Sequence, residues 1–186
     1  MDGVVADFNG GWMDAFNAER GTSLHPDLVD GWDVLPTLTG FTDMSAFWDW
    51  ARDLGAGHSV FRHLSPFPGA IQTLQCLVAA GHDVVIITAK PDWSIPDTLS
   101  WLGDHRIQAR EVHFAFDKWK IDCDVYVDDA PHVLEDLVRH RPSRRILRFV
   151  RSWNRPLEGT TSVRSWDDVE QAVSKFASDT VTSDVT

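Results

Sequence analysis

The sequence predicts a doubly wound α/β fold with a small helical cap inserted after the first loop. From residue 65 onward, short apolar segments rich in β-branched residues alternate with segments of helical periodicity. This alternation is typical of a parallel sheet covered by helices, with ligands bound at the carboxyl ends of its strands. The segment before residue 65 interrupts the alternation, which predicts an insertion.

Two segments have the composition of strands buried on both faces, 82–88 and 124–128. Each is apolar with little polar alternation, as parallel central strands are. Segment 145–150 favours a strand nearer one edge, and segment 112–116 is a weaker fourth candidate.

Helical patterns lie between and after these strands. They are predicted between Pro68 and Gly81, at 95–102, at 131–140, and after the capping signature at 165–168. Amphipathic pieces at 12–19 and 45–54 predict helices in the insertion. We therefore expect a core of residues 1–9 and 65–177, a helical cap of residues 10–64, and a polar, disordered tail of residues 178–186.

Composition limits the classes of partner and the compartment. The chain has 186 residues and a formal net charge of -11, from 17 basic and 28 acidic residues. This charge argues against a nucleic-acid polymer or an anionic membrane surface as the partner. No signal peptide or membrane-spanning run is recognised, and Cys76 and Cys123 have no metal-ligand spacing, so we expect a cytoplasmic protein with reduced thiols. The sequence does not decide between a monomer and a homodimer.

The chain opens on half of a phosphate-transfer motif, Met1-Asp2-Gly3-Val4-Val5. An Asp-x-Asp-Gly-Val loop works because one carboxylate attacks phosphorus while the other serves the leaving-group oxygen as general acid and base. Asp2 is the later carboxylate, and the earlier one would stand directly before Met1. An ordinary Asp-Gly turn near a terminus is the alternative interpretation.

Two further positions suit a phosphoryl group. Thr88 ends the strand 84–87, so its hydroxyl and the following backbone N–H groups, beginning with Ala89, could hold phosphate oxygens. Lys118 precedes the next strand and could offset the charge of phosphate and carboxylates, with Lys120 as its rival. Taken alone, Thr88 is also compatible with an ordinary strand end, and Lys118 with an ordinary solvated lysine on a loop.

Adjacent carboxylates follow the second buried strand, at Asp128 and Asp129. Such crowding is costly unless a cation or hydrogen-bond donors compensate, and Mg²⁺ prefers oxygen ligands. We therefore predict a metal role for Asp128 and a supporting role for Asp129. Capping of the helix that begins at Pro131 is compatible with this role.

In this order, these motifs resemble the haloacid dehalogenase superfamily of phosphohydrolases, and more closely the 5'(3')-deoxyribonucleotidase family. The opening motif of that family, Asp-Met-Asp-Gly-Val-x-Ala-Asp-Phe, resembles residues 1–8, and its Gly-Gly-aromatic continuation resembles residues 10–12. The segments 66–70, 117–118, 127–129, 153–154 and 165–166 are also similar to family segments.

The resemblance implies a Mg²⁺-dependent phosphomonoesterase that acts through an aspartyl-phosphate on a small phosphorylated substrate such as a nucleotide. By the resemblance, Asp2 protonates the leaving oxygen and activates water, and its backbone carbonyl helps Asp128 hold Mg²⁺. Thr88 and Lys118 would bind the phosphoryl group. Aromatic residues that could stack on a base are Phe8, Trp12, Trp32 and Phe67.

The nucleophile of the family precedes its motif Met, and two explanations compete for its absence from the sequence. The chain is a variant without phosphatase chemistry, or its recorded start is an internal Met. In this fold a central strand precedes the Asp loop. Without it, several side chains would lose burial worth ~1.5 to 3 kcal/mol each. The sum is comparable with the whole stability of a domain, ~5 to 15 kcal/mol. We therefore expect the second explanation. A non-catalytic nucleotide- or protein-binding module, and a phosphatase for another small phosphoester, remain alternatives.

Overall fold

The computed structural model describes residues 1–31 and 34–183, and it is a mixed α/β structure with helices and parallel strands. Seven strands lie in these ranges: β1 (Ala6–Asp7), β2 (Ser65–Pro66), β3 (Val85–Thr88), β4 (Glu111–Phe114), β5 (Val125–Asp128), β6 (Arg145–Phe149) and β7 (Thr161–Val163). Seven α-helices lie there as well: α1 (Phe8–Arg20), α2 (Leu35–Thr39), α3 (Met44–Ala51), α4 (Ala70–Ala79), α5 (Ile95–Asp104), α6 (Pro131–His140) and α7 (Trp166–Ser183). Short 3-10 helices are η1 (Pro26–Leu28), η2 (Val60–Arg62), η3 (Asp92–Ser94) and η4 (Lys118–Lys120).

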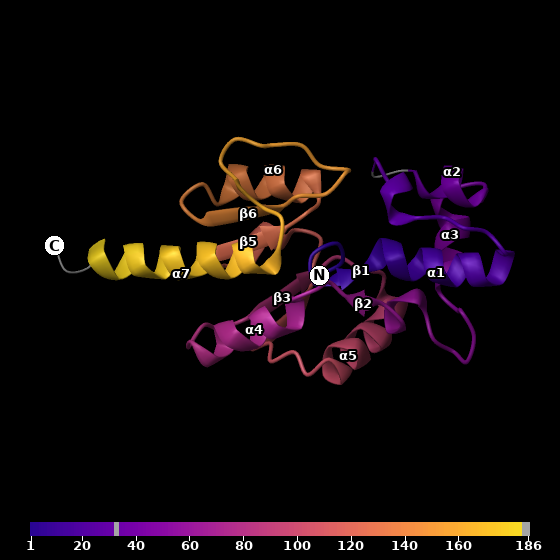
Figure 1. Cartoon of the computed structure of the whole chain (residues 1–186), viewed down its shortest axis with the longest axis horizontal. Helices are drawn as coiled ribbons and strands as arrows, with labels where there is room; N and C mark the ends of the chain where they lie inside the picture. Colours follow the sequence, from indigo (N-terminus) through magenta and orange to yellow (C-terminus); the bar gives the residue numbers. More distant parts are fainter. Residues whose placement is uncertain (32–33, 184–186) are drawn as a thin grey trace.

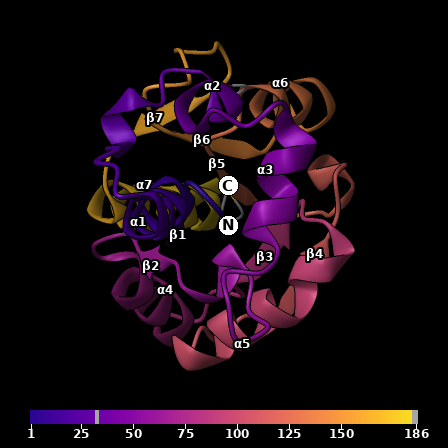
Figure 2. The same ribbon diagram turned by 90° about the vertical axis from the view of Figure 1, so that its right-hand side faces the viewer.

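The parallel strands form two separate sheets. Strands β3 and β4 pair with each other, and β5, β6 and β7 form the other sheet in that order. Figure 2 shows the two sheets in different sectors of the molecule, β3 and β4 toward the lower right and β5 to β7 at the top. The four predicted strands are present, and β1, β2 and β7 are additions that were not predicted. The expectation that segment 145–150 lies nearer an edge is wrong, because β6 is the middle strand of its sheet, with β5 on one side and β7 on the other.

The segment between β1 and β2 is helical. Strands β1 and β2 pair in antiparallel fashion, so the chain leaves and returns at one place. Figure 1 shows α1, α2 and α3 together at one end of the long axis, α4, α6 and α7 with β3, β5 and β6 toward the other, and β1, β2 and α5 between them. The polypeptide therefore passes twice through a narrow connection between the helical segment and the sheets.

Local sequence explains where this connection begins. The Asp7 carboxylate accepts a hydrogen bond of 2.9 Å from the backbone N–H of Gly10 and so caps α1. Helix α1 ends at Gly21, which has the left-handed backbone that glycine adopts without strain (φ 66°). Trp12, Met13 and Phe16 on α1 are buried against the other helices of the segment.

The C-terminal boundary differs from the expectation. Helix α7 continues to Ser183, whereas the sequence analysis predicted disorder from residue 178. The prediction is wrong for residues 178–183, because a polar composition does not prevent an amphipathic helix from continuing once it is anchored on its buried residues Trp166, Val169 and Val173. Residues 184–186 lie outside the described part of the chain.

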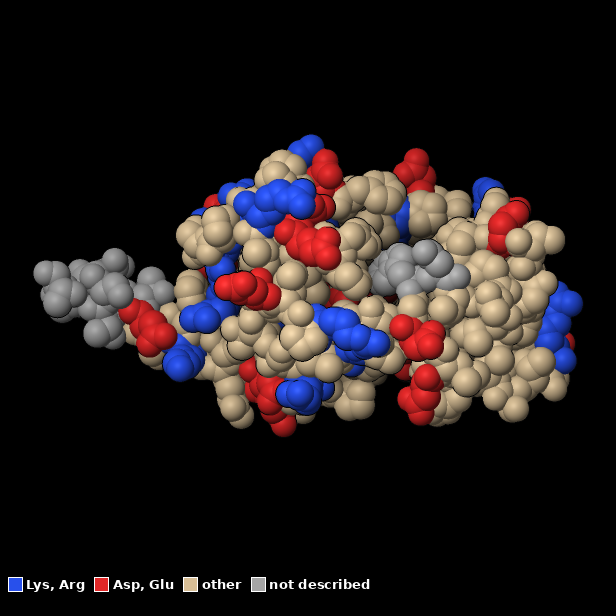
Figure 3. Space-filling view, turned by 90° about the horizontal axis from the view of Figure 1, so that it is seen from above, with Lys and Arg blue, Asp and Glu red and all other residues tan. Residues whose placement is uncertain are grey.

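Charged side chains are mixed on the surface. On the face shown in Figure 3, Lys and Arg lie singly or in small groups beside Asp and Glu. Among the described residues, no helix is both long enough and apolar enough to cross a bilayer.

Candidate active site

The Asp loop is folded tightly against the end of β5. The backbone carbonyl of Met1 accepts hydrogen bonds from the N–H groups of Val4 (3.3 Å), Val5 (2.8 Å) and Ala6 (3.2 Å). Gly3 has a φ of 72°, and a Cβ at this position would lie 2.2 Å from Oδ2 of Asp129. Only glycine fits here, and its close approach brings Asp2 next to the paired carboxylates.

The carboxyl end of β5 carries a buried ion pair. Nζ of Lys118 lies 2.7 Å from Oδ2 of Asp128, and the two side chains are 12% and 6% exposed. Oδ1 of Asp128 accepts the backbone N–H groups of Asp129 and Ala130, both at 3.0 Å. The Asp128 carboxylate is thus held by three donors at the start of α6. By contrast, Lys120, the rival of Lys118, pairs with Asp117 in solvent.

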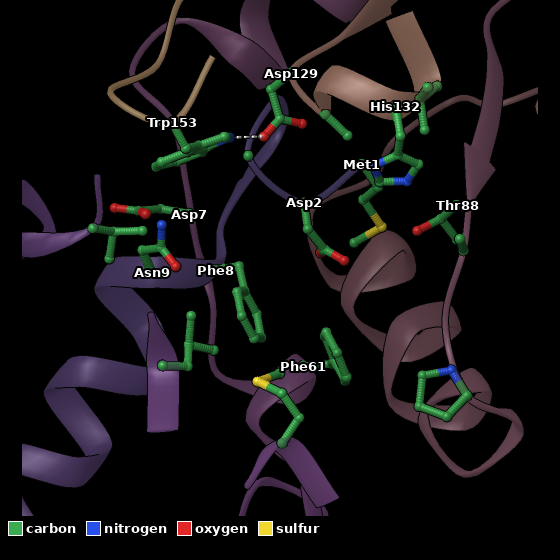
Figure 4. A pocket seen from close by; sticks show the side chains of 18 of the residues that line it. Met1, Asp2, Asp7, Phe8, Asn9, Phe61, Thr88, Asp129, His132 and Trp153 are labelled. Atoms are coloured by element: carbon green, nitrogen blue, oxygen red, sulfur yellow. Dashed lines mark hydrogen bonds between the residues drawn. The ribbon is translucent and has the colours of Figure 1, made fainter. Parts of the chain in front are cut away.

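The two adjacent carboxylates are electrostatically different. Burial would raise the pKa of Asp128, but Lys118 and the amino group of Met1 outweigh it and hold this pKa below its usual range. Burial and the charge of Asp128 raise the pKa of Asp129 to about 7. Nε1 of Trp153 donates a hydrogen bond of 3.0 Å to Oδ2 of Asp129 (Figure 4). The site therefore has one firmly ionised carboxylate and one that exchanges a proton near neutral pH.

A cavity of about 220 Å³ lies between these groups and the helical segment. Figure 4 shows Asp2, Thr88 and Asp129 around it, with Phe8 and Phe61 on the side of the helical segment. The sequence-predicted residues that line it are Asp2, Phe8, Phe67, Thr88, Ala89, Lys118 and Asp129. Asp128 does not line this cavity, but its carboxylate accepts a hydrogen bond from Lys118, which does line it.

One of the predicted aromatic residues, Trp12, does not line this cavity. It is fully buried and packs edge to face on Phe47 with ring centroids 5.5 Å apart. Its predicted role in stacking on a base is therefore corrected to core packing of the helical segment. Trp32 lies outside the described residues.

Lys90 also belongs to the site, although it was not predicted from the sequence. Its ammonium group lies 3.0 Å from Oδ1 of Asp2, without the alignment of a hydrogen bond, and its side chain is 1% exposed. The same group lies 3.8 Å from the centroid of the Phe61 ring. Burial lowers the pKa of Lys90, and Asp2 offsets part of that effect. Its position two residues after Thr88 was a signal that could have been used.

Aromatic rings from the helical segment form a wall that the sequence analysis also missed in part. The rings of Phe8 and Phe61 are stacked, with centroids 5.6 Å apart and an interplanar angle of 21°. The ring of Trp48 stacks on Phe61 at 6.2 Å and 19°. All three residues line the cavity, so aromatic side chains and the polar groups of the Asp loop border the same space.

A divalent cation would be held by few protein ligands. Within residues 1–31 and 34–183, no three His, Cys, Asp or Glu side chains gather as a metal cluster. Asp128 is an ionised carboxylate at the end of β5, and Asp2, whose carboxylate lies 3.0 Å from Lys90, has its backbone carbonyl as a second oxygen ligand. Mg²⁺ is commonly bound by one or two carboxylates with waters and substrate phosphate, so these residues fit it.

Comparison with known proteins identifies the family. Residues 1–178 match the profile of a family described as "5' nucleotidase, deoxy (Pyrimidine), cytosolic type C protein". The chain belongs to this nucleotidase family. Its predicted relation to the 5'(3')-deoxyribonucleotidases and to the haloacid dehalogenase superfamily is thereby confirmed.

Relatives of this nucleotidase-family chain carry names that are themselves provisional. A protein of Chlorobaculum tepidum, provisionally named a 5'(3')-deoxyribonucleotidase, is 28% identical over 95% of the chain and 88% of its own length. A protein of Oceanobacillus iheyensis, provisionally named a nucleotidase, is 31% identical over 56% of the chain. The chain spans 60% of the length of that second relative.

Solved structures confirm the fold class. The crystal structure of a dehalogenase in complex with an intermediate has a TM-score of 0.55 and 17% identity, and covers 90% of the chain and 92% of its own. A second dehalogenase structure has a TM-score of 0.54 and 16% identity. At this level of identity the likeness concerns the fold alone.

Proposed function

We propose that the protein is a Mg²⁺-dependent phosphomonoesterase that dephosphorylates deoxynucleoside or nucleoside monophosphates through an aspartyl-phosphate. The observation that carries the proposal is the convergence of Asp2, Thr88 and Lys118 on one cavity, with the Lys118–Asp128 pair at its edge. The nucleophilic carboxylate of this mechanism is expected directly before Met1. The cytoplasm, expected from the sequence, agrees with the word "cytosolic" in the family description.

Each polar group has a task for which its environment is suited. The Thr88 hydroxyl and the N–H of Ala89 donate to phosphoryl oxygens, and Lys118 adds a positive charge beside them. Asp2 gives a proton to the leaving oxygen and then takes one from the attacking water. Mg²⁺, held by Asp128 and the Asp2 carbonyl, would neutralise charge on the phosphoryl group.

The aromatic wall supports a nucleotide over a phosphoester without a ring. Phe61 stacks on Phe8 and on Trp48, and all three residues line the cavity. Stacking of a base on an aromatic side chain contributes about 1 to 3 kcal/mol. A sugar phosphate has no ring to stack on this aromatic lining, which is why we place it second.

The test uses a version of the protein with an apolar segment ending in Asp upstream of Met1. Phosphate release is measured with Mg²⁺ on a panel of 5'- and 3'-nucleoside monophosphates and sugar phosphates. We expect turnover of nucleotides that Asp2→Asn abolishes and that the exposed control Asp49→Asn leaves unchanged. Turnover of sugar phosphates alone would overturn the substrate assignment.

The same protein separates the enzyme from a non-catalytic module. If it binds nucleotide and Mg²⁺, seen as a thermal shift, but releases no phosphate from any ester, the catalytic proposal fails and the binding module is favoured. Ligand at 100 times its dissociation constant would add about 2.7 kcal/mol to stability. Binding is therefore measurable whether or not turnover occurs.

A further inference from the structure

The Arg151 guanidinium group contacts the Asp loop but does not line the active-site cavity. Its Nε donates a hydrogen bond of 2.8 Å to the backbone carbonyl of Gly3. Its Cζ lies 4.1 Å from the centroid of the Phe67 ring and 4.3 Å from that of Phe149, the last residue of β6. Guanidinium groups stack on aromatic faces, and these contacts restrict the plane of the side chain. The donor is thereby directed at the Asp loop.

Ion pairing does not explain the position of this arginine. Among the described residues, no carboxylate lies within ion-pair distance of its guanidinium group, and its Nη2 is buried without a hydrogen-bond partner. Burial lowers the pKa of Arg151, although the charges of Asp129 and Asp7 oppose this effect. A buried cation without a paired charge costs free energy. The role of Arg151 is therefore to be found in the backbone that it holds.

The Gly3 carbonyl belongs to the turn that directs the Asp2 side chain. Within the turn, the N–H of Gly3 donates a hydrogen bond of 3.0 Å to the carbonyl of Ala6. The Cα of Gly3 is close to Asp129, since an added Cβ would lie 2.2 Å from its Oδ2. Arg151 adds a hydrogen bond from outside the turn, on the residue that directly follows Asp2. Loss of this bond would leave the peptide after Gly3 without its donor, and a rotation of that peptide would move Asp2.

The loop of residues 151–154 also holds the carboxylate that follows β5. Nε1 of Trp153 donates a hydrogen bond of 3.0 Å to Oδ2 of Asp129, as Figure 4 shows. Nδ2 of Asn154 donates one of 2.8 Å to the backbone carbonyl of Asp129. Oδ1 of Asn154 accepts the backbone N–H of Arg151 at 3.3 Å. One loop therefore fixes the Asp loop and Asp129 relative to each other.

We propose that Arg151 is a positioning residue for Asp2, because its hydrogen bond to Gly3 keeps the Asp loop in place beside Asp129. The inference rests on the proposed function, in which Asp2 transfers a proton to the leaving oxygen. Such a transfer needs donor and acceptor within hydrogen-bond reach, so a small displacement of Asp2 slows it. Arg151 does not line the cavity, so it acts through the Asp loop and not on the substrate.

Hydrogen exchange of the unextended chain tests whether Arg151 holds the Asp loop. Arg151→Met removes the donor but keeps an unbranched side chain. We expect the amides of Gly3, Val5 and Ala6 to exchange at least about tenfold faster, because their hydrogen bonds open more often when the turn is released. Arg155→Met is the matched control, since Arg155 donates to backbone carbonyls within its own loop. Equal exchange at these amides in the wild type and in Arg151→Met would overturn the proposal.

A second variant covers the case in which Arg151→Met does not fold. Arg151→Lys keeps a positive charge but lacks the planar fork that lies against the two rings. Faster exchange in the Asp loop, with unchanged exchange in α4, would support the proposal. Exchange that is unchanged in the Asp loop, or that rises equally in the Asp loop and in α4, would overturn it.

Turnover separates this inference from the proposed function. In the version with the upstream Asp, Arg151→Met should lower the turnover number about 10- to 100-fold with little change in KM, since Asp2 acts in the chemical step. Arg155→Met should leave both constants unchanged. An equal turnover number in the parent and in Arg151→Met would overturn the positioning role while the proposed function stands. If the parent releases no phosphate from any ester, the proposed function fails, and hydrogen exchange alone decides whether Arg151 positions the Asp loop.

Discussion

Nζ of Lys90 lies 3.0 Å from the carboxylate of Asp2 and 3.8 Å from the centroid of the Phe61 ring. One buried cation thus contacts the Asp loop and the aromatic wall of the helical segment at the same time. The Asp2 side chain is 25% exposed, so it is the member of the pair that substrate and water can reach. Lys90 is a positioning residue for Asp2 in the proposed mechanism.

The first prediction concerns this contact. Replacing Lys90 by Met keeps a long apolar stem but removes the charge that orients Asp2. In the version with the upstream Asp, we expect the turnover number to fall about 10- to 100-fold with little change in KM, because misplacing a catalytic group by ~1 Å has an effect of this size. Steady-state phosphate release measures it. Lys90→Arg keeps the charge and should recover part of the loss, whereas an equal loss in both variants would speak against an electrostatic role.

A second prediction compares two lysines that are two residues apart. Lys118→Met leaves the buried Asp128 carboxylate without its partner, and breaking such a pair costs about 3 to 5 kcal/mol. Lys120→Met breaks an exposed pair with Asp117, which contributes only about 0 to 1 kcal/mol. Urea unfolding of the two variants without Mg²⁺ should show this difference. Similar losses in both would mean that the Lys118 pair is as well solvated as the Lys120 pair.

Strand ends were the part of the site that sequence could predict. Doubly wound folds bind ligands at the carboxyl ends of their strands, so Thr88 at the end of β3 and the residues after β5 were expected near the Asp loop. Position before β5 left Lys118 and Lys120 as rivals, and the resemblance to the family's spacing favoured Lys118. The strand-end prediction for Thr88 depended on short β-branched segments, whereas the choice of Lys118 depended on the resemblance.

The other part of the site depends on packing that no local pattern encodes. Trp12 and Phe8 lie four residues apart on one helix, yet Trp12 is fully buried while Phe8 lines the cavity. When a helix is covered on most sides, periodicity does not tell which aromatic ring faces the ligand. Phe61 and Lys90 meet across the junction of the helical segment and the core, and a contact over that sequence distance has no signature in either segment.

The third prediction concerns the metal. If Asp128 holds Mg²⁺, the cation should raise the melting temperature of the protein, and at 100 times its dissociation constant it should add about 2.7 kcal/mol of stability. Asp128→Asn should abolish that shift, because it removes the ionised ligand. The matched control is Asp117→Asn, since Asp117 pairs with Lys120 on the surface. An equal Mg²⁺ shift in the wild type and in Asp128→Asn would exclude Asp128 as a ligand.

The last prediction concerns the connection between the helical segment and α5. The Asp97 carboxylate accepts hydrogen bonds from the backbone N–H (2.6 Å) and hydroxyl (2.7 Å) of Ser59, and it lies 3.2 Å from Nδ1 of His58. Burial alone would raise the pKa of Asp97, but these contacts to Ser59 and His58 outweigh it and lower the pKa below its ordinary 3.8. Hydrogen bonds to a charged group contribute about 1.5 to 3 kcal/mol, so Asp97→Asn should destabilise the protein by about this amount at pH 7.

The pH dependence of that loss follows from the direction of the shift. A carboxylate whose folded-state pKa is lowered stabilises the fold above the unfolded-state pKa, and that stabilisation is lost as the pH falls through the folded-state value. The difference in unfolding free energy between the wild type and Asp97→Asn should therefore shrink as the pH falls below 3.8. Urea unfolding at a series of pH values measures it, with Asp83→Asn as the control, because the Asp83 pair with Arg110 is exposed. A difference that grows as the pH falls below 3.8 would contradict the lowered pKa, since it would require the proton to bind more tightly to Asp97 in the folded chain than in the unfolded one.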